Sequence, residues 1–278
     1  MEWVTATSGD LVESLREQVC IIPIGCLEEH GKHLPMGIDG LIAHKLAFMA
    51  TQEEPAVVLP TLYYMSVMCM KHRPGTISMD THLLLDFLEK LCDEVARNGF
   101  KKVILLNCHG GNQRLLHLFV QWHILDKHKE YMVYYPPGII YWDEQLTQQI
   151  RETSDIGHAC EIETSVALYL FPELCKMERI PKEYHRVRED HNPCCVPAAC
   201  TYKPISPAIT YIDWYASYPR AYTGDARKAS AEKGRLLVEP AVKKLVQLIR
   251  NVKNDKTLLA RSKEFASLVE RPEWLHDR

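Results

Sequence analysis

A chain of 278 residues is long enough to bury a full hydrophobic core, in one large α/β domain or in two smaller domains. Hydrophobic residues make up 46% of the chain and charged residues 25%, and the formal net charge is −3. This balance excludes the strong field of a nucleic-acid-binding protein and the apolar bulk of a membrane protein. We therefore expect a small molecule as partner, with no nucleic acid and no membrane.

The N-terminal segment and the cysteines indicate the compartment. The first 15 residues lack the basic start and apolar run of a secretory signal, and nowhere do 18 uncharged apolar residues follow one another. The ten cysteines form no CxxC pair and cluster only at Cys194, Cys195 and Cys200. This pattern favours buried free thiols over a disulfide framework, and it predicts a cytoplasmic protein.

Apolar, β-rich runs alternate with helical periodicity through the first half of the chain, as a parallel sheet with helical crossovers requires. The predicted elements are, in chain order, a helix from 7 or 8 to about 16, a strand at 19–24, a helix from about 39 to 50, a strand at 56–59, a mixed segment at 62–70, a helix from 80 with Phe87 on its apolar face, a strand at 102–107, a helix from about 112 to 127 and a strand at 131–135. An α/β fold follows from this order.

The second half has a weaker pattern. Helices are predicted at 161–170 and from about 226 to 251. Between them, the segment from Pro181 to Ala221 is rich in proline, tyrosine and cysteine, and we interpret it as an irregular excursion that forms a lid or an oligomer contact. We expect residues 1–278 to form a single domain that carries this excursion.

A polar loop directly follows the first predicted strand. Glu28 and His30 alternate along an extended segment, so both side chains can point the same way, and Asp39 follows eleven residues after Glu28. A carboxylate such as Asp39 can bridge two divalent ions, and the ligand set suits zinc, manganese or iron. Short Glu/His clusters also occur on solvated loops, but polar residues that leave a buried strand indicate a function.

A second polar turn follows the strand at 102–107. His109 precedes Gly110 and Gly111, and parallel neighbouring strands would bring it to the same sheet edge as Glu28. The glycines allow a close approach of the backbone. In the alternative interpretation, Asn112 caps the following helix and the histidine is merely exposed.

A third group consists of His158, Glu161 and Glu163, which precede or begin an apolar helix. In a structural interpretation, either carboxylate only favours the positive end of that helix. In a functional one, His158 transfers protons and Glu163 binds a metal or orients water.

Five sequence blocks occur in a fixed order. They are PxGxxExHGxHLP at 23–35 followed by Asp39, PGTIS at 74–78, NxHGGN at 107–112, HAxExETS at 158–165 and GDARKASAEKG at 224–234. Together they resemble the creatininase, or creatinine amidohydrolase, family over about residues 20–235.

The resemblance implies a three-layer α/β/α fold with a mostly parallel central sheet, a homo-oligomer of six subunits, and a centre of two divalent metal ions (zinc, manganese or iron) per subunit. It implies hydrolysis of cyclic amides by a metal-activated water, while relatives deformylate a formamidopyrimidine or cleave a modified peptide. By motif position, Glu28 and His109 resemble ligands of one ion, and Asp39 resembles the bridge to a second. His30 resembles a ligand of that second ion, and Glu163 completes its ligand set. His158 resembles the residue that transfers a proton. The expected substrate contacts are Thr76, Gly110, Gly111 and Asn112.

The chain departs from the family pattern at several positions. Creatinine-cleaving members carry an aromatic residue and then a glutamate, one metal ligand, where this chain has Gly110 and Gly111. Glu29 and Cys160 stand where glutamine and glycine are common. We therefore predict a metal-dependent amidohydrolase that cleaves a non-peptide C–N bond in a cyclic amide or formamide other than creatinine.

Two alternatives remain open. The first is a formamidopyrimidine deformylase-like enzyme of cofactor biosynthesis, for which Lys32, Lys71 and Arg73 could bind a phosphate. The second is a non-catalytic metal-binding protein of the same fold, against which the intact His158 and Glu163 argue.

Overall fold

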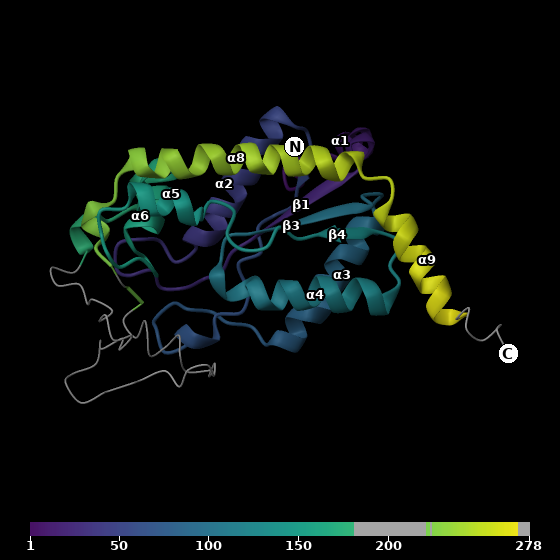
Figure 1. Cartoon of the computed structure of the whole chain (residues 1–278), viewed down its shortest axis with the longest axis horizontal. Coiled ribbons are helices and arrows are strands. Elements are labelled where there is room, and N and C mark those ends of the chain that lie inside the picture. Colours follow the sequence, from purple (N-terminus) through teal and green to yellow (C-terminus); the bar gives the residue numbers. More distant parts are fainter. Residues whose placement is uncertain (181–220, 223, 272–278) are drawn as a thin grey trace.

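The computed structural model describes residues 1–180, 221–222 and 224–271 (Figure 1). A four-stranded sheet forms its centre, with strand order β2-β1-β3-β4. The strands are β1 (Val19–Ile24), β2 (Val57–Val58), β3 (Lys102–Asn107) and β4 (Met132–Tyr134), and every pairing is parallel. The central strands β1 and β3 are buried along nearly their whole length, which explains their continuous apolar sequences.

Helices cover both faces of the sheet (Figure 1). On one face, α2 (Ile38–Glu53), α6 (Glu161–Leu170) and α8 (Ala231–Asn254) pack in a core cluster with Ile21 and Ile104. On the other face, α3 (Thr81–Arg97) and α4 (Gln113–Lys127) flank a second cluster that contains Ile22 and Leu105. The alternation of neighbouring strand residues between the two clusters confirms the predicted three-layer α/β/α architecture.

Local chemistry explains where the helices begin and end. The Asp80 side chain accepts hydrogen bonds from the backbone amides of His82 and Leu83, which starts α3. Gly99, with a φ of 103°, follows the end of that helix. The last long helix begins five residues later than predicted, because a 3-10 turn occupies Ala226–Lys228 before the Ser230 side chain caps α8.

Several elements differ from the prediction. Strands β2 and β4 are shorter, and Phe87 is 44% exposed although it was placed on the apolar face of its helix. The helices α5 (Glu144–Ile150) and α9 (Leu258–Glu270) were not predicted, while α1 (Ser8–Ser14) was. The excursion at 181–221, with its cysteine cluster, lies outside the described residues except for Ala221. No helix of the described residues is long and apolar enough to span a membrane.

Candidate metal centre

The polar side chains gather at the carboxyl ends of β1 and β3. These two strands are neighbours, and their register pairs Ile24 with Asn107. The amide of Cys108 continues the ladder by donating to the carbonyl of Ile24 over 3.0 Å. The loop that holds Glu28 and the turn that begins at His109 therefore start side by side, as expected for strand ends in an open α/β sheet.

Asp39 reaches the site because the first turn of α2 packs directly against the end of β1. A Cβ atom on Gly25 would lie 2.1 Å from the backbone nitrogen of Gly40, so no side chain fits between strand and helix. The helix begins at Ile38, and Asp39 lies in its first turn with only 3% of its surface exposed. The positive end of the helix favours the ionised carboxylate there.

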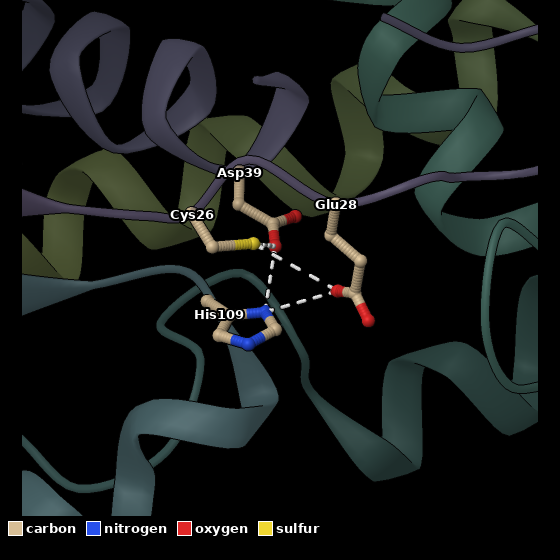
Figure 2. A group of neighbouring side chains, drawn as sticks. All are labelled: Cys26, Glu28, Asp39 and His109. Atoms are coloured by element: carbon tan, nitrogen blue, oxygen red, sulfur yellow. Dashed lines mark hydrogen bonds and ion pairs between the residues drawn. The ribbon is translucent and has the colours of Figure 1, made fainter. Parts of the chain in front are cut away.

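Four donor atoms converge at the centre (Figure 2): the thiol of Cys26, one oxygen each of Glu28 and Asp39, and Nδ1 of His109. His109 Nδ1 lies 2.9 Å from Oδ2 of Asp39 and 3.4 Å from Oε2 of Glu28. The Cys26 Sγ lies 3.3 Å from the same Asp39 oxygen and 3.8 Å from the same Glu28 oxygen. All four residues are buried.

His30 and His158 complete a second group with Glu28, whose donor atoms lie within 4.8 Å of one another. His30 Nε2 is 3.3 Å from Oδ1 of Asp39, the oxygen that does not face His109. Its Nδ1 lies 3.2 Å from the carbonyl of Glu28. A hydrogen bond from Nδ1–H to that carbonyl would leave Nε2 unprotonated, with its electron pair directed at the centre.

The carboxylates and imidazoles shift one another's pKa values strongly. Burial disfavours a charged His30, but the neighbouring Asp39 outweighs it and raises the pKa of His30 to about 10. Burial likewise opposes the charged form of His109, and Glu28 and Asp39 raise its pKa. Burial alone would raise the pKa of Asp39, yet the two histidines hold it well below its usual range. The buried carboxylates of the cluster thus stabilise positive charge placed next to them.

The spacing of these donors fits a divalent ion. Zinc bonds of about 2.1 Å to oxygen or nitrogen put tetrahedral ligand atoms about 3.4 Å apart. The separations of His109 Nδ1 from the Glu28 and Asp39 oxygens are 3.4 Å and 2.9 Å, close to this value. Two carboxylates and two imidazoles are also the ligand types that zinc, manganese and iron share.

His158, a member of the second donor group, lies on the segment before α6. Its ring centroid is 4.2 Å from that of His30, and its Nε2 is 2.7 Å from the carbonyl of Glu29. Burial, and then the nearby His30, lower the pKa of His158 to about 4. The imidazole is therefore neutral at neutral pH.

The backbone beside His158 has an unusual conformation. Ala159 is buried with a φ of 53°, in the left-handed region that costs an L-residue about 1–2 kcal/mol. Glu163 Oε2 accepts a hydrogen bond from its amide over 2.5 Å, and Thr164 Oγ1 donates to its carbonyl over 3.2 Å. Burial raises the pKa of Glu163 to about 7, against the effect of His30. The start of α6 thus fixes the position of His158.

The other glutamate of the third block has a structural position. Glu161 is fully buried and points away from the donors, toward the loop before α6 and toward α8. Its carboxylate accepts hydrogen bonds from the backbone amides of Glu152 and Thr153 and lies 2.5 Å from Lys233 Nζ. The structural interpretation therefore applies to Glu161, whereas Glu163 lies within electrostatic reach of His30 and Asp39.

The glycine turn leaves space on one side of His109. Gly110 and Gly111 are exposed, and a Cβ atom on Gly111 would lie 2.5 Å from His109 Nε2. That nitrogen is buried and has no hydrogen-bond partner among the described residues. Asn112, expected to contact substrate, is fully buried and donates from Nδ2 to the carbonyl of Gly25 over 3.0 Å. It ties the turn to the end of β1.

The PGTIS block approaches the loop after β1 through a bridge between Leu27 and Ile77. Thr76, the expected substrate contact in this block, is partly buried, and its Oγ1 is buried with no hydrogen-bond partner among the described residues. The block therefore lies beside the metal-binding loop.

Two of the three proposed phosphate-binding cations are paired within the protein. Arg73 forms a bidentate pair with Glu29, with both nitrogen-to-oxygen distances at 2.8 Å, and Lys32 Nζ lies 2.9 Å from the same carboxylate. Glu29 itself is only 3% exposed. One carboxylate thus balances one of these two positive charges and holds both side chains at this edge.

Three residues at the site were not identified from the sequence as site residues. Cys26 was interpreted as one of many buried thiols, although it precedes Glu28 by two positions in an alternating segment. His33 Nε2 lies 2.9 Å from Thr164 Oγ1, which joins the β1 loop to α6. Tyr141 is buried, and burial together with the charges of Glu163 and Asp39 raises the pKa of its hydroxyl.

Two proteins with similar sequences align with most of this chain. A creatinine amidohydrolase of Pseudomonas putida is 28% identical over 246 residues, which cover 84% of this chain and 88% of that protein. A 3-dehydro-scyllo-inosose hydrolase of Thermotoga maritima is 26% identical over 275 residues and covers 89% and 82% of the two chains.

Solved creatininase structures share the fold. A mutant described as the Zn–Zn type is 24% identical, with a TM-score of 0.71 and coverage of 91% of this chain and 98% of that chain. A creatininase described as the manganese form is also 24% identical, with a TM-score of 0.72 and coverage of 91% and 99%. The family model described as creatininase, creatinine amidohydrolase, matches residues 5–249. This chain therefore belongs to the creatininase family of amidohydrolases.

Proposed function

We propose that the protein uses two divalent metal ions to hydrolyse a non-peptide C–N bond in a small cyclic amide or formamide. The observation that carries this proposal is the position of Asp39, whose Oδ2 faces His109 while its Oδ1 faces His30. A carboxylate whose two oxygens serve two separate imidazoles has the arrangement of a bridge between two ions.

Each proposed ion has its own donors. Glu28 and His109 would hold the first ion, His30 and Glu163 the second, and Asp39 would bridge them. Bound divalent ions supply an activated water and polarise the amide carbonyl. The buried carboxylates fit this role, because they need compensating positive charge and no lysine or arginine of the described residues pairs with Glu28 or Asp39.

His158 is proposed to move the proton. Its low pKa leaves the ring neutral, so it enters the reaction able to accept a proton as water attacks the carbonyl carbon. The same proton can then pass to the departing nitrogen as the C–N bond breaks. The hydrogen bond to the carbonyl of Glu29 and the fixed backbone of Ala159 orient the ring for this transfer.

The turn after His109 supports the proposed substrate class. Gly110 and Gly111 are exposed and present backbone rather than an aromatic wall, and their N–H groups are the proposed donors to substrate oxygen atoms. Thr76 is a further proposed contact, while Asn112 is proposed to position the turn. A cytoplasmic location and assembly into a hexamer remain predictions from composition and resemblance.

Two variants test the proposal. Asp39→Asn removes the bridging charge and should lose bound metal, measured by elemental analysis of protein purified without chelator, together with hydrolysis of a panel of formamides and cyclic amides. His158→Asn should retain both ions but lose at least about a hundredfold in kcat. Full activity of His158→Asn would overturn its role, and a wild-type protein without divalent ions would overturn the whole proposal.

A further inference from the structure

A fourth donor lies beside the proposed first ion, and the family motif does not account for it. The proposed ligands there are Glu28, Asp39 and His109, and the thiol of Cys26 completes the group of four buried donor atoms (Figure 2). Cys26 reaches this position because it follows the closely packed Gly25 at the end of β1. The close approach of Gly25 to the backbone of Asp39 and Gly40 brings Cys26 next to Asp39.

The distances to Cys26 match those between ligands of one ion. With a zinc–sulfur bond of about 2.3 Å and zinc–oxygen bonds of about 2.1 Å, a tetrahedral ion separates sulfur from oxygen by about 3.6 Å. The Cys26 Sγ lies 3.3 Å from the Asp39 oxygen and 3.8 Å from the Glu28 oxygen, on either side of this value. The oxygens it faces are the same atoms that face His109.

The thiol of Cys26 has an apolar cluster with Val67, Met70 and Ala221 around it and the two carboxylates beside its sulfur. Cys26 is fully buried between two carboxylates, and its Sγ–H can serve only as a weak hydrogen-bond donor to them. Without an ion, a thiolate there would face two negative charges. A divalent ion placed among the four donors would reverse that repulsion and let the sulfur bind as thiolate.

We propose that Cys26 is a direct ligand of the first metal ion and biases this site toward zinc over manganese. The inference rests on the proposed two-metal centre. Thiolate is a soft ligand that zinc accepts and that manganese, which prefers oxygen, does not favour. On binding, the Sγ–H bond breaks, the proton leaves to solvent and the sulfur electron pair goes to the ion.

Cobalt(II) reports sulfur ligation directly, because a cobalt–thiolate bond gives an intense charge-transfer band in the near ultraviolet that oxygen and nitrogen ligands do not give. Metal-free protein titrated with cobalt should develop this band in the wild type. Cys26→Ser should bind cobalt without the band. Cys69→Ser is the matched control, since Glu28 lies close enough to influence its thiol but Cys69 is not one of the four donors, and it should retain the band.

Metal selectivity gives a second measurement. Dialysis against a zinc and manganese mixture should show a preference for zinc that falls by on the order of tenfold in Cys26→Ser. X-ray absorption of the wild-type zinc protein should show sulfur scattering at about 2.3 Å, which needs no variant and covers the case of a misfolded Cys26→Ser.

The outcomes separate this inference from the proposed function. Cobalt binding by the wild type without a charge-transfer band, a band that persists in Cys26→Ser, or a zinc protein without sulfur scattering would each overturn the role of Cys26 and leave the metal centre intact. A wild-type protein that binds neither cobalt nor zinc would overturn the metal centre and this inference with it.

Discussion

At the scale of single residues, Asp39 and His109 owe their geometry to glycines more than to their own side chains. Gly25 lets the first turn of α2 approach the end of β1, and Gly111 leaves room for the ring of His109. A Cβ atom on Gly25 would lie 2.1 Å from the backbone nitrogen of Gly40, and one on Gly111 would lie 2.5 Å from the ring nitrogen Nε2 of His109, distances at which something must move. The site therefore depends on positions that carry no chemistry themselves.

Gly111→Ala should displace the ring of His109, because the new Cβ would lie 2.5 Å from Nε2. We expect the affinity for the first metal ion to fall by about tenfold or more, measured by competition with a chromophoric chelator. Gly110→Ala is the matched control, since a Cβ there has no neighbouring atom within 4 Å, and it should bind metal as the wild type does. Equal metal affinities of the two variants would contradict the inference that Gly111 is needed to leave room for the ring of His109.

The sequence could predict a large part of the site because parallel strands end at a common edge. Glu28, His30 and His109 each follow a strongly apolar strand, and the structure brings them together with Asp39. The sequence could not predict pairings between distant segments. The neutralisation of Glu29 by Arg73 joins residues 44 positions apart, and the proximity of Cys26 to Asp39 depends on a helix packing against a strand.

At the scale of elements, the packing of α8 against α6 explains the fifth sequence block. A Cβ on Gly234 would lie 2.0 Å from the carbonyl oxygen of Ser165, so the two helices touch through backbone. The amide of Ser230 donates to Ser165 Oγ, and Lys233 pairs with the buried Glu161. This block supports the helix that carries Glu163 and contributes no donor of its own to the centre.

Glu161→Gln should destabilise the protein by about 3 kcal/mol at neutral pH, because it removes the charge that faces Lys233 in a buried position. Lys233, Thr153 and backbone amides lower the pKa of Glu161 against the effect of burial. A pKa below the unfolded value of about 4.3 gives stability above that pH, and this stability is lost as the pH falls further. The difference from wild type in urea unfolding should thus shrink below about pH 4.

The exposed Glu232→Gln provides the control for Glu161→Gln. Glu232 pairs with Arg235 on the surface of α8, and its replacement should change the unfolding midpoint little at any pH. A pH-independent difference between Glu161→Gln and wild type would show that the buried pair is not the cause.

The element boundaries show where sequence patterns reach their limit. The long strands β1 and β3 were predicted with their observed ends, since an uninterrupted apolar run has few other structures available in a parallel sheet. The short helix α5 lacks a strong apolar stripe, and its start depends on the Asp143 side chain bonding to the amide of Leu146. Phe87 fits the helical periodicity of α3 but lies outside the packed face.

At the scale of the whole molecule, the family match and the fold cover different lengths. The match ends at residue 249, within α8, whereas the described chain continues through α9. Everything that positions the candidate donors lies inside the matched region. The prediction of a single domain is compatible with one sheet and two helical layers but stays a prediction.

Removal of divalent ions should lower the melting temperature of the whole protein. Ions present at about a hundredfold above their Kd stabilise by about 2.7 kcal/mol per site, or about 5–10 °C for a protein of this size. The effect should diminish as the pH is lowered, because protons held by His30, with its pKa raised to about 10, and by His109 compete with the ions. Calorimetry with and without zinc between pH 6 and 9 measures it, and identical melting temperatures throughout would contradict it.

Because β1 pairs with β3 across some eighty intervening residues, His109 joins Cys26, Glu28 and Asp39 only when these two strands have paired. Pairings between segments so far apart in the chain form slowly. The ligand set of the first ion is therefore incomplete while the polypeptide is still collapsing. We therefore expect metal to bind after the protein has folded. The ion that a freshly made molecule acquires will depend on which divalent metals the cell has available at that moment as well as on the ligands themselves.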